Sequence, residues 1–210
     1  MSRYAKLTIG LVAVWFLISL IASSLHLYRA GQNQPPLPLG LAAGVPILIF
    51  IAWFSISNGF GEFVLSLSAR VLTLVQSWRI AGFVFLVLAT YGILPRFFAL
   101  PAGWGDITIG ATATLAALYL ADARHRFGFI VWQLLGMADL IMAVLLGTLA
   151  GVLDPHGIPT SVMAVLPLSL IPTFAVPLLL ILHMICIAQA LQWPKQTTLQ
   201  TAQQQRTASA

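Results

Sequence analysis

Six long apolar stretches dominate the chain, and short polar segments separate them. Each stretch is near the ~20 residues that a helix needs to cross the hydrocarbon core of a bilayer. The stretches cover residues 7–28, 37–56, 80–94, 107–121, 128–153 and 170–191. This pattern predicts an all-α fold, a polytopic transmembrane helix bundle with six spans.

The segment 62–78 has a different pattern. Polar residues recur at helical spacing along one side of it, and apolar residues line the opposite side. Such a split surface is typical of a helix that lies along a membrane rather than across it. We therefore expect one amphipathic interfacial helix at about 62–78, before the third span. A seventh crossing there would place Arg70 in lipid, so six spans are favoured.

Two prolines and two closely spaced glycines mark the segment 95–106. They predict a tight external hairpin after the third span, in which Arg96 and Asp106 pair and Asp106 caps the fourth span. A re-entrant element facing a cavity is the alternative, because irregular backbone at membrane depth needs protein or water around it. In that case Arg96 and Asp106 become cavity contacts.

Composition supports the membrane class. The chain is 60% hydrophobic and 7% charged, whereas ordinary soluble domains carry roughly 25% charged residues. We expect residues 1–191 to form a single transmembrane domain in contact with the lipid bilayer. The tail 192–210 is rich in Gln, Thr, Ser and Ala, which predicts a disordered cytoplasmic segment.

The basic residues predict an orientation. The chain has ten Lys and Arg residues. With the N-terminus in the cytoplasm, only Arg29 and Arg96 fall on the far side, which leaves eight on the cytoplasmic side. This bias follows the positive-inside rule and predicts a bacterial cytoplasmic (inner) membrane protein with both termini in the cytoplasm. Because the basic residues are scattered, a nucleic-acid partner is not expected.

Asp139 is the leading candidate for chemistry, since it stands near the centre of the uncharged apolar run 128–153. A carboxylate at that depth costs roughly 2.5–3.5 kcal/mol on insertion scales, so it normally faces protein or water and has a partner. It predicts an intramembrane proton, ion or ligand site, with simple helix–helix hydrogen bonding as the alternative. His183 falls at a similar depth in the last span and could share a proton with Asp139.

Arg79 is expected at the cytoplasmic start of the third span, with Gln76 on the same side of the helix. Anchoring of this arginine at the interface is the favoured interpretation. The alternatives are that Gln76 and Arg79 contact an anionic headgroup or substrate, or that Arg79 reaches Asp139 along the bundle.

Small residues on the Asp139 side of the fifth span predict close helix packing there, at Gly136, Gly147 and Gly151. These positions leave open a docked membrane-protein partner or a homo-oligomer. The histidines fall at different depths or sides, so no metal site is expected. No cofactor motif is evident either. No nucleophile, base and orienting group stand at plausible spacing, so an enzyme is disfavoured.

Four sequence segments together resemble a group of bacterial multi-pass proteins that are labelled only as hypothetical integral membrane proteins. The segments are 76–79, 97–106, 136–140 and 170–174. This resemblance implies no activity, cofactor or site residue. On the basis of Asp139 and His183, the leading hypothesis is small-solute or proton-linked transport or binding through a polar site at the membrane midplane. The competing hypothesis is a non-catalytic scaffold or accessory subunit of a larger membrane complex.

Overall fold

The structure is a computed structural model that describes residues 3–29, 36–154 and 156–193, with the side chains of 151 and 152 left out. The described residues are predominantly helical and contain no β-strand. The expected disordered tail, 192–210, lies almost entirely outside the described residues.

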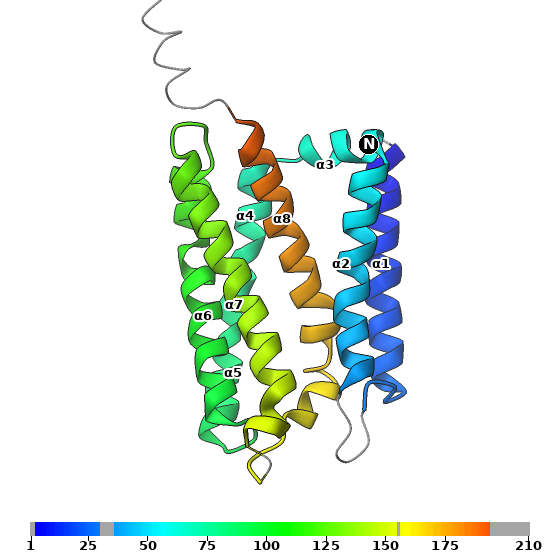
Figure 1. Cartoon of the computed structure of the whole chain (residues 1–210), viewed down its shortest axis with the longest axis vertical. Coiled ribbons are helices and arrows are strands. Elements are labelled where there is room, and N and C mark those ends of the chain that lie inside the picture. The colour runs from blue at the N-terminus through cyan, green and yellow to red at the C-terminus, as the bar shows by residue number, and fades with distance from the viewer. Residues whose placement is uncertain (1–2, 30–35, 155, 194–210) are drawn as a thin grey trace, which may run out of the picture.

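The helices form six rods that run along the long axis of the molecule (Figure 1). The first two rods are α1 (Arg3–Ser24) and α2 (Leu37–Ile56), and the short helix α3 (Asn58–Leu65) lies across one end of the bundle. The third rod comprises α4 (Ala69–Val75), the 3₁₀ segment η1 (Gln76–Gly82) and α5 (Phe83–Thr90). The fourth comprises α6 (Arg96–Leu115) and the π segment η2 (Ala116–Leu120).

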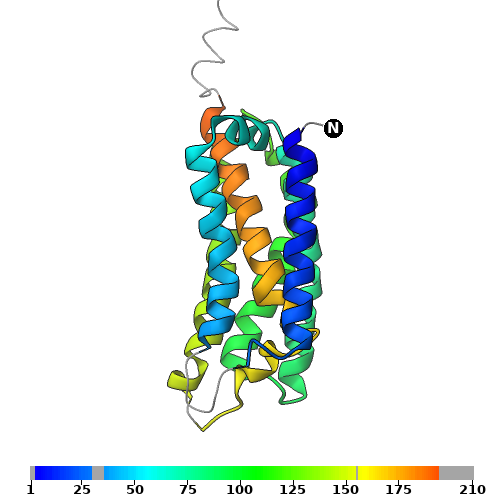
Figure 2. The same ribbon diagram turned by 90° about the vertical axis from the view of Figure 1, so that its right-hand side faces the viewer.

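The fifth rod is α7 (Arg126–Leu153). A connection that includes the 3₁₀ turn η3 (Thr160–Ala164) leads to the last rod, which consists of the π segment η4 (Ile171–Ala175) and α8 (Val176–Gln192). In Figure 2 the last rod passes between α1 and α2, and residue contacts join α2 to α8 and α1 to η4. The start of α1 and the end of α8 lie at the same end of the bundle (Figure 1).

Five helices are long and apolar enough to cross a membrane: Arg3–Ser24, Leu37–Ile56, Ala69–Thr90, Arg126–Ala150 and Ile171–Gln192. The rod that begins with α6 is not among them, although it runs beside the others (Figure 1). Its sequence contains Arg96 and Asp106 together with several glycines, which lower its mean hydropathy. The structure thus shows an all-α protein with five helices that are able to span a bilayer.

The expected interfacial helix 62–78 is not one element. α3 ends at Leu65, and α4 begins at Ala69, where the Ser68 hydroxyl accepts a hydrogen bond from the Val71 backbone N–H (3.4 Å). The helical rod then continues to Thr90, so the third rod begins well before residue 80. The pattern combined polar residues of different kinds: Glu62, Ser66 and Arg70 are exposed, whereas Thr73 is buried inside the third rod and faces protein.

The hairpin predicted for 95–106 is also wrong. The chain turns between α5 and α6, and α6 then runs without a break from Arg96 through Asp106. Asp106 therefore lies in the middle of a helix and caps nothing. Pro101 lies inside α6, in its second turn, where its missing N–H leaves the Phe97 carbonyl, four residues earlier, without that helical donor. Arg96 is exposed and does not pair with Asp106.

Candidate charged site in the bundle core

Arg79 is central to the site and lies near the middle of the third rod, in η1. It is only 3% exposed. The predicted position at the end of a span is therefore wrong, and so is the favoured interpretation that this arginine anchors the helix at an interface. The side chain is directed into the bundle instead.

The Arg79 guanidinium contacts three other rods. Its Nε donates to Asp106 Oδ1 on α6 (2.7 Å), and its Nη2 donates to Asp139 Oδ2 on α7. Its Nη1 donates to the backbone carbonyl of Gly136 on α7 (3.0 Å) and lies 3.3 Å from His183 Nε2 on α8. Each of these residues stands near the middle of its own helix. We call Arg79, Asp106 and Asp139 the charged cluster.

A chain of buried hydrogen bonds continues from His183. Its Nδ1 lies 2.5 Å from Gln133 Oε1, and Gln133 Nε2 donates to Thr73 Oγ1 (3.1 Å). Because the amide of Gln133 presents its oxygen, His183 Nδ1 must carry a proton. A neutral imidazole then has its lone pair on Nε2, where it can accept from Arg79. His183 is therefore satisfied as a neutral ring.

Asp139 and His183 come together through Arg79. The expected proton sharing between them requires a direct contact, and the bonds of the described residues include none. Arg79 lies between the carboxylate and the imidazole and bonds to both. The two side chains are thus linked through a cation.

The charged cluster holds unequal charges. One guanidinium faces two carboxylates, so the cluster has a net charge of −1 when both carboxylates are ionised and 0 when one is protonated. Asp139 Oδ1 is buried and has no hydrogen-bond partner. A buried charge that is not compensated costs far more than a neutral group. The arrangement therefore favours a site with a place for one proton, on the unpartnered oxygen.

Three glycines make room for these side chains. A Cβ at Gly105 would lie 1.6 Å from Asp139 Oδ1, and one at Gly82 would lie 2.3 Å from the Cβ of Asp106. A Cβ at Gly136 would lie 2.4 Å from His183 Cε1. The helices can approach closely enough to enclose the polar groups only because these positions lack side chains.

The remaining candidate residues lie around or away from the charged cluster. Gln76 is buried and its Nε2 donates to the Leu179 carbonyl (3.2 Å), while its Oε1 has no partner. Arg96 stands at the start of α6, outside the site. A Cβ at Gly147 would meet the ring of Phe98 at 3.3 Å, so this glycine serves packing within the chain. The surroundings of Gly151 lie outside the description.

Sequence reasoning missed Gly82, Gly105, Gln133 and Thr73. Gln133 stood in an apolar run, as Asp139 did, and an uncharged amide there was a signal of a buried polar contact. Gly82 was assigned no role, and Gly105 was interpreted as part of a turn, since the role of each glycine depends on which carboxylate lies opposite. In the described part of the chain, no group of three or more His, Cys, Asp or Glu side chains is placed to hold a metal ion.

The fold and the site define the class of this protein: an all-α bundle of long apolar helices whose core encloses an arginine between two aspartates. The chain belongs to the family described as Domain of unknown function (DUF8737), whose model matches residues 36–191. The match includes every residue of the charged cluster. No curated protein and no solved structure matches the chain significantly.

Proposed function

We propose that this chain is an integral membrane protein in which all six rods cross the bilayer, with α3 at one surface. The five long apolar helices support this arrangement, and α6 runs alongside them (Figure 1). Charge supports an orientation with both termini in the cytoplasm of a bacterial cell. Arg70 and Arg126 begin rods at the end of the bundle where α1 starts, whereas Arg96 begins α6 at the opposite end (Figure 1).

The function that the geometry supports best is proton-linked binding or passage of a small solute, with the charged cluster as the proton site. The observation that supports it is the sharing of one guanidinium by two carboxylates, with Asp139 Oδ1 left unpartnered. Proton uptake there neutralises the cluster. Proton relays in membrane transporters are built from acidic and imidazole side chains at this depth.

Protonation would also change how the rods are held together. A neutral Asp139 binds Arg79 less strongly, while the contacts of Arg79 with Asp106, Gly136 and His183 remain. The bond that weakens is one of the two from Arg79 that join η1 to α7, and a 3₁₀ stretch in the middle of a helical rod often marks a hinge. Movement of α7 relative to the third rod is the expected response to a proton.

Infrared difference spectroscopy of the protein in lipid tests the proton site. In the wild type, a carboxylic-acid C=O band should appear and disappear as the pH is varied, and Asp139→Asn should remove or shift it. Identical pH-dependent spectra of the wild type and Asp139→Asn would overturn the proposal. Proteoliposomes with an internal pH dye then test whether the same variant abolishes proton movement that is driven by a solute gradient.

Asp122→Asn is the matched control, because Asp122 lies in the loop between the fourth and fifth rods. Its slight burial would raise the pKa of this carboxyl. Hydrogen bonds from the backbone and ring of His125 outweigh that effect and hold the pKa below its ordinary value. A folded-state pKa that is lowered in this way means that Asp122 is protonated only in acid. The control should therefore leave the band of Asp139 unchanged.

A scaffold or accessory subunit is the second candidate. It is favoured by the tight packing at Gly82, Gly105 and Gly136, and by two described cavities, neither of which is lined by the charged cluster. The outward position of Gly40 and Gly44 on α2, with nothing within 4 Å of either Cβ site, suits a docked helix. Purification in mild detergent would then recover a stoichiometric partner, and Gly40→Leu with Gly44→Leu would release it.

A further inference from the structure

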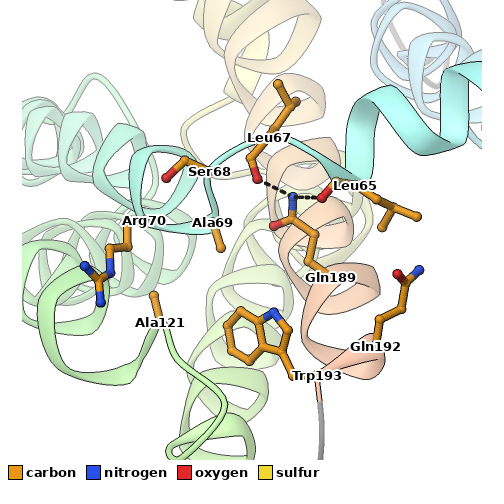
Figure 3. Close-up of a pocket in the computed structure, with 9 residues that line it drawn as sticks. All are labelled: Leu65, Leu67, Ser68, Ala69, Arg70, Ala121, Gln189, Gln192 and Trp193. Atoms are coloured by element: carbon orange, nitrogen blue, oxygen red, sulfur yellow. Dashed lines mark hydrogen bonds between the residues drawn. The ribbon is translucent and has the colours of Figure 1, made fainter.

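A cavity of about 510 Å³ lies at the end of the bundle that contains α3 (Figure 3), and no residue of the charged cluster lines it. The link between α3 and α4 forms one wall, and the end of α8 forms another. Its lining includes Arg70, Ala121, Gln189, Gln192 and Trp193. The cavity is within the range of about 300–1,000 Å³ that is typical of small-molecule sites.

Two polar groups of the wall lack a partner. Arg70 is exposed and takes part in none of the ion pairs or side-chain hydrogen bonds of the described residues. Gln189 is only 5% exposed, and its Nε2 donates to the backbone carbonyls of Val64, Leu65 and Leu67 at 3.2, 3.3 and 2.8 Å. These three bonds fix the orientation of the amide, and Oε1 is left without a donor.

The unpartnered oxygen is itself buried and points toward the cavity, whose lining includes Gln189. Figure 3 shows the carboxamide oxygen of Gln189 on the side toward Ala69 and Ala121, whereas its nitrogen is turned toward the carbonyls of Leu65 and Leu67. A buried acceptor with no donor costs about 1–3 kcal/mol. A ligand that supplies a donor at this point would remove that cost.

The wall opposite is held in place by other contacts. Arg126 donates from Nη1 to the Trp193 carbonyl (3.1 Å) and from Nη2 to the Leu191 carbonyl (3.2 Å). The Trp193 ring packs against Phe129, with 5.2 Å between the ring centroids. Arg126 is thus engaged in fixing the end of α8, and Arg70 is the cation of the lining that is free to bind an anion.

We propose that this cavity binds the headgroup of an anionic lipid, a phosphodiester that also carries hydroxyl groups, as in phosphatidylglycerol. Arg70 would bind the phosphate, and Gln189 Oε1 would accept a hydrogen bond from a glycerol hydroxyl. Basic pockets between helices near a membrane surface bind lipid headgroups, and tryptophan is enriched at that level. The inference rests on the proposed membrane location, but it is independent of the proton site.

Binding of defined probes to the detergent-solubilised full-length protein tests the proposal. The probes are dihexanoyl phosphatidylglycerol, dihexanoyl phosphatidylcholine and free glycerol 3-phosphate, with native mass spectrometry and thermal stabilisation as readouts. Phosphatidylglycerol should bind at least about tenfold more tightly than phosphatidylcholine, whose headgroup has no donor, a difference of about 1.4 kcal/mol. Equal binding of the two lipids would overturn the proposal.

Two arginine variants distinguish a specific binding site from a general attraction of anionic lipid to positive charge. Arg70→Gln should lose phosphatidylglycerol binding by about tenfold, whereas Arg124→Gln should retain it, because Arg124 is exposed at the same end but does not line the cavity. Equal affinities in the two variants would overturn the site. Binding of glycerol 3-phosphate that depends equally on Arg70 would support the site and identify a soluble phosphate ester as its source.

The result can be separated from that for the proton site. Arg70→Gln should leave the pH-dependent infrared band of Asp139 unchanged, because Arg70 lies at one end of the third rod, whereas Asp139 lies near the middle of α7. Loss of lipid binding with the band retained supports this inference. Loss of the band alone would count against the proposed proton site without affecting the lipid site.

Discussion

The rod pair α1–α2 and the rods from α4 to α8 have the same apolar character but are held in the molecule differently. Mean hydropathy is 2.2 for both α1 and α2, and it lies between 1.8 and 2.3 for the three long apolar helices of the second region. In contrast, 11% and 6% of the residues of α1 and α2 are buried, against 28–44% in the other three. Hydropathy alone therefore does not distinguish the two regions.

Polar contacts distinguish them. The second region encloses an arginine, two aspartates and a histidine, and each of its rods contributes to that network. Between helices in lipid there is no hydrophobic driving force, so association depends on close packing and on hydrogen bonds. The part of the molecule with the larger number of buried polar groups is, for this reason, the part with the tighter core.

α1 is attached by a few polar contacts to the last rod. Pro177 has no backbone N–H, so the carbonyl of Thr173, four residues earlier, lacks the donor that an α-helix would supply. That carbonyl accepts hydrogen bonds from Trp15 Nε1 (3.1 Å) and Ser19 Oγ (3.4 Å). The proline in the last rod thus leaves a carbonyl free to accept the hydrogen bonds that attach α1. The family match begins at residue 36, after α1.

The largest expected effect is that of Arg79→Leu. Removal of this side chain leaves two carboxylates facing each other without a cation, and breaking a buried pair costs about 3–5 kcal/mol. We expect a loss of that size in the free energy of unfolding, measured in mild detergent by thermal or denaturant titration. The exposed Arg96→Gln should change stability by no more than about 0.5 kcal/mol. Similar stability of the two variants would mean that the charged cluster does not hold the second region together.

Glycine-to-alanine substitutions test the same difference between the two regions, because each of them adds a single methyl group. Gly105→Ala places a Cβ against Asp139, and overpacking of this kind costs about 1–3 kcal/mol. Gly40→Ala on α2 meets nothing within 4 Å and should be neutral or stabilising by up to about 1 kcal/mol, because alanine favours helix. Unfolding of both variants under one set of conditions provides the measurement. A stable Gly105→Ala protein would contradict the geometry of the charged cluster.

Much of the fold could be predicted from hydropathy. The prediction of α2 as residues 37–56 is confirmed, and α7 begins two residues before the expected 128. Helices long and apolar enough to span were expected and found for five rods. α2 and α7 have no internal cation, so in both of them the apolar run and the helix have nearly the same ends.

The third and fourth rods were misplaced for one physical reason. Sequence reasoning placed Arg79 and Asp106 at the ends of spans because each charge alone is costly in lipid. In the structure each compensates the other at the middle of its rod, so neither marks an end. Pairing is a property of two segments, and a hydropathy window considers one segment at a time.

The candidate site was predictable to a similar extent. Asp139 and His183 stood out because each interrupts an apolar run, and the structure brings them within reach of the same guanidinium. A contact of Arg79 with Asp139 was one of the alternatives that the sequence offered, but the further link to His183 could not be read from the chain, since it depends on how far the third rod extends. Gly82 and Gly105 acquire a role only when α6 lies against its neighbours.

The smallest expected effect concerns the attachment of α1. Pro177→Ala restores a backbone N–H that can bond to the Thr173 carbonyl, and it then competes with the indole of Trp15. Hydrogen bonds between membrane helices contribute about 0.6 kcal/mol on average, so Trp15→Phe should destabilise by roughly that amount. In the Pro177→Ala background the same change should cost less, because the acceptor is already engaged.

A double-mutant cycle of unfolding free energies measures this coupling, with Trp78→Phe as the control because that indole is largely exposed on the third rod. Non-additive effects of Trp15→Phe and Pro177→Ala, and additive effects of Trp78→Phe and Pro177→Ala, are expected. Additivity in both cycles would mean that the carbonyl left by the proline does not hold α1. The attachment of the N-terminal rod would then depend on Ser23 and Ser169, whose hydroxyls lie 2.8 Å apart at the other end of the contact.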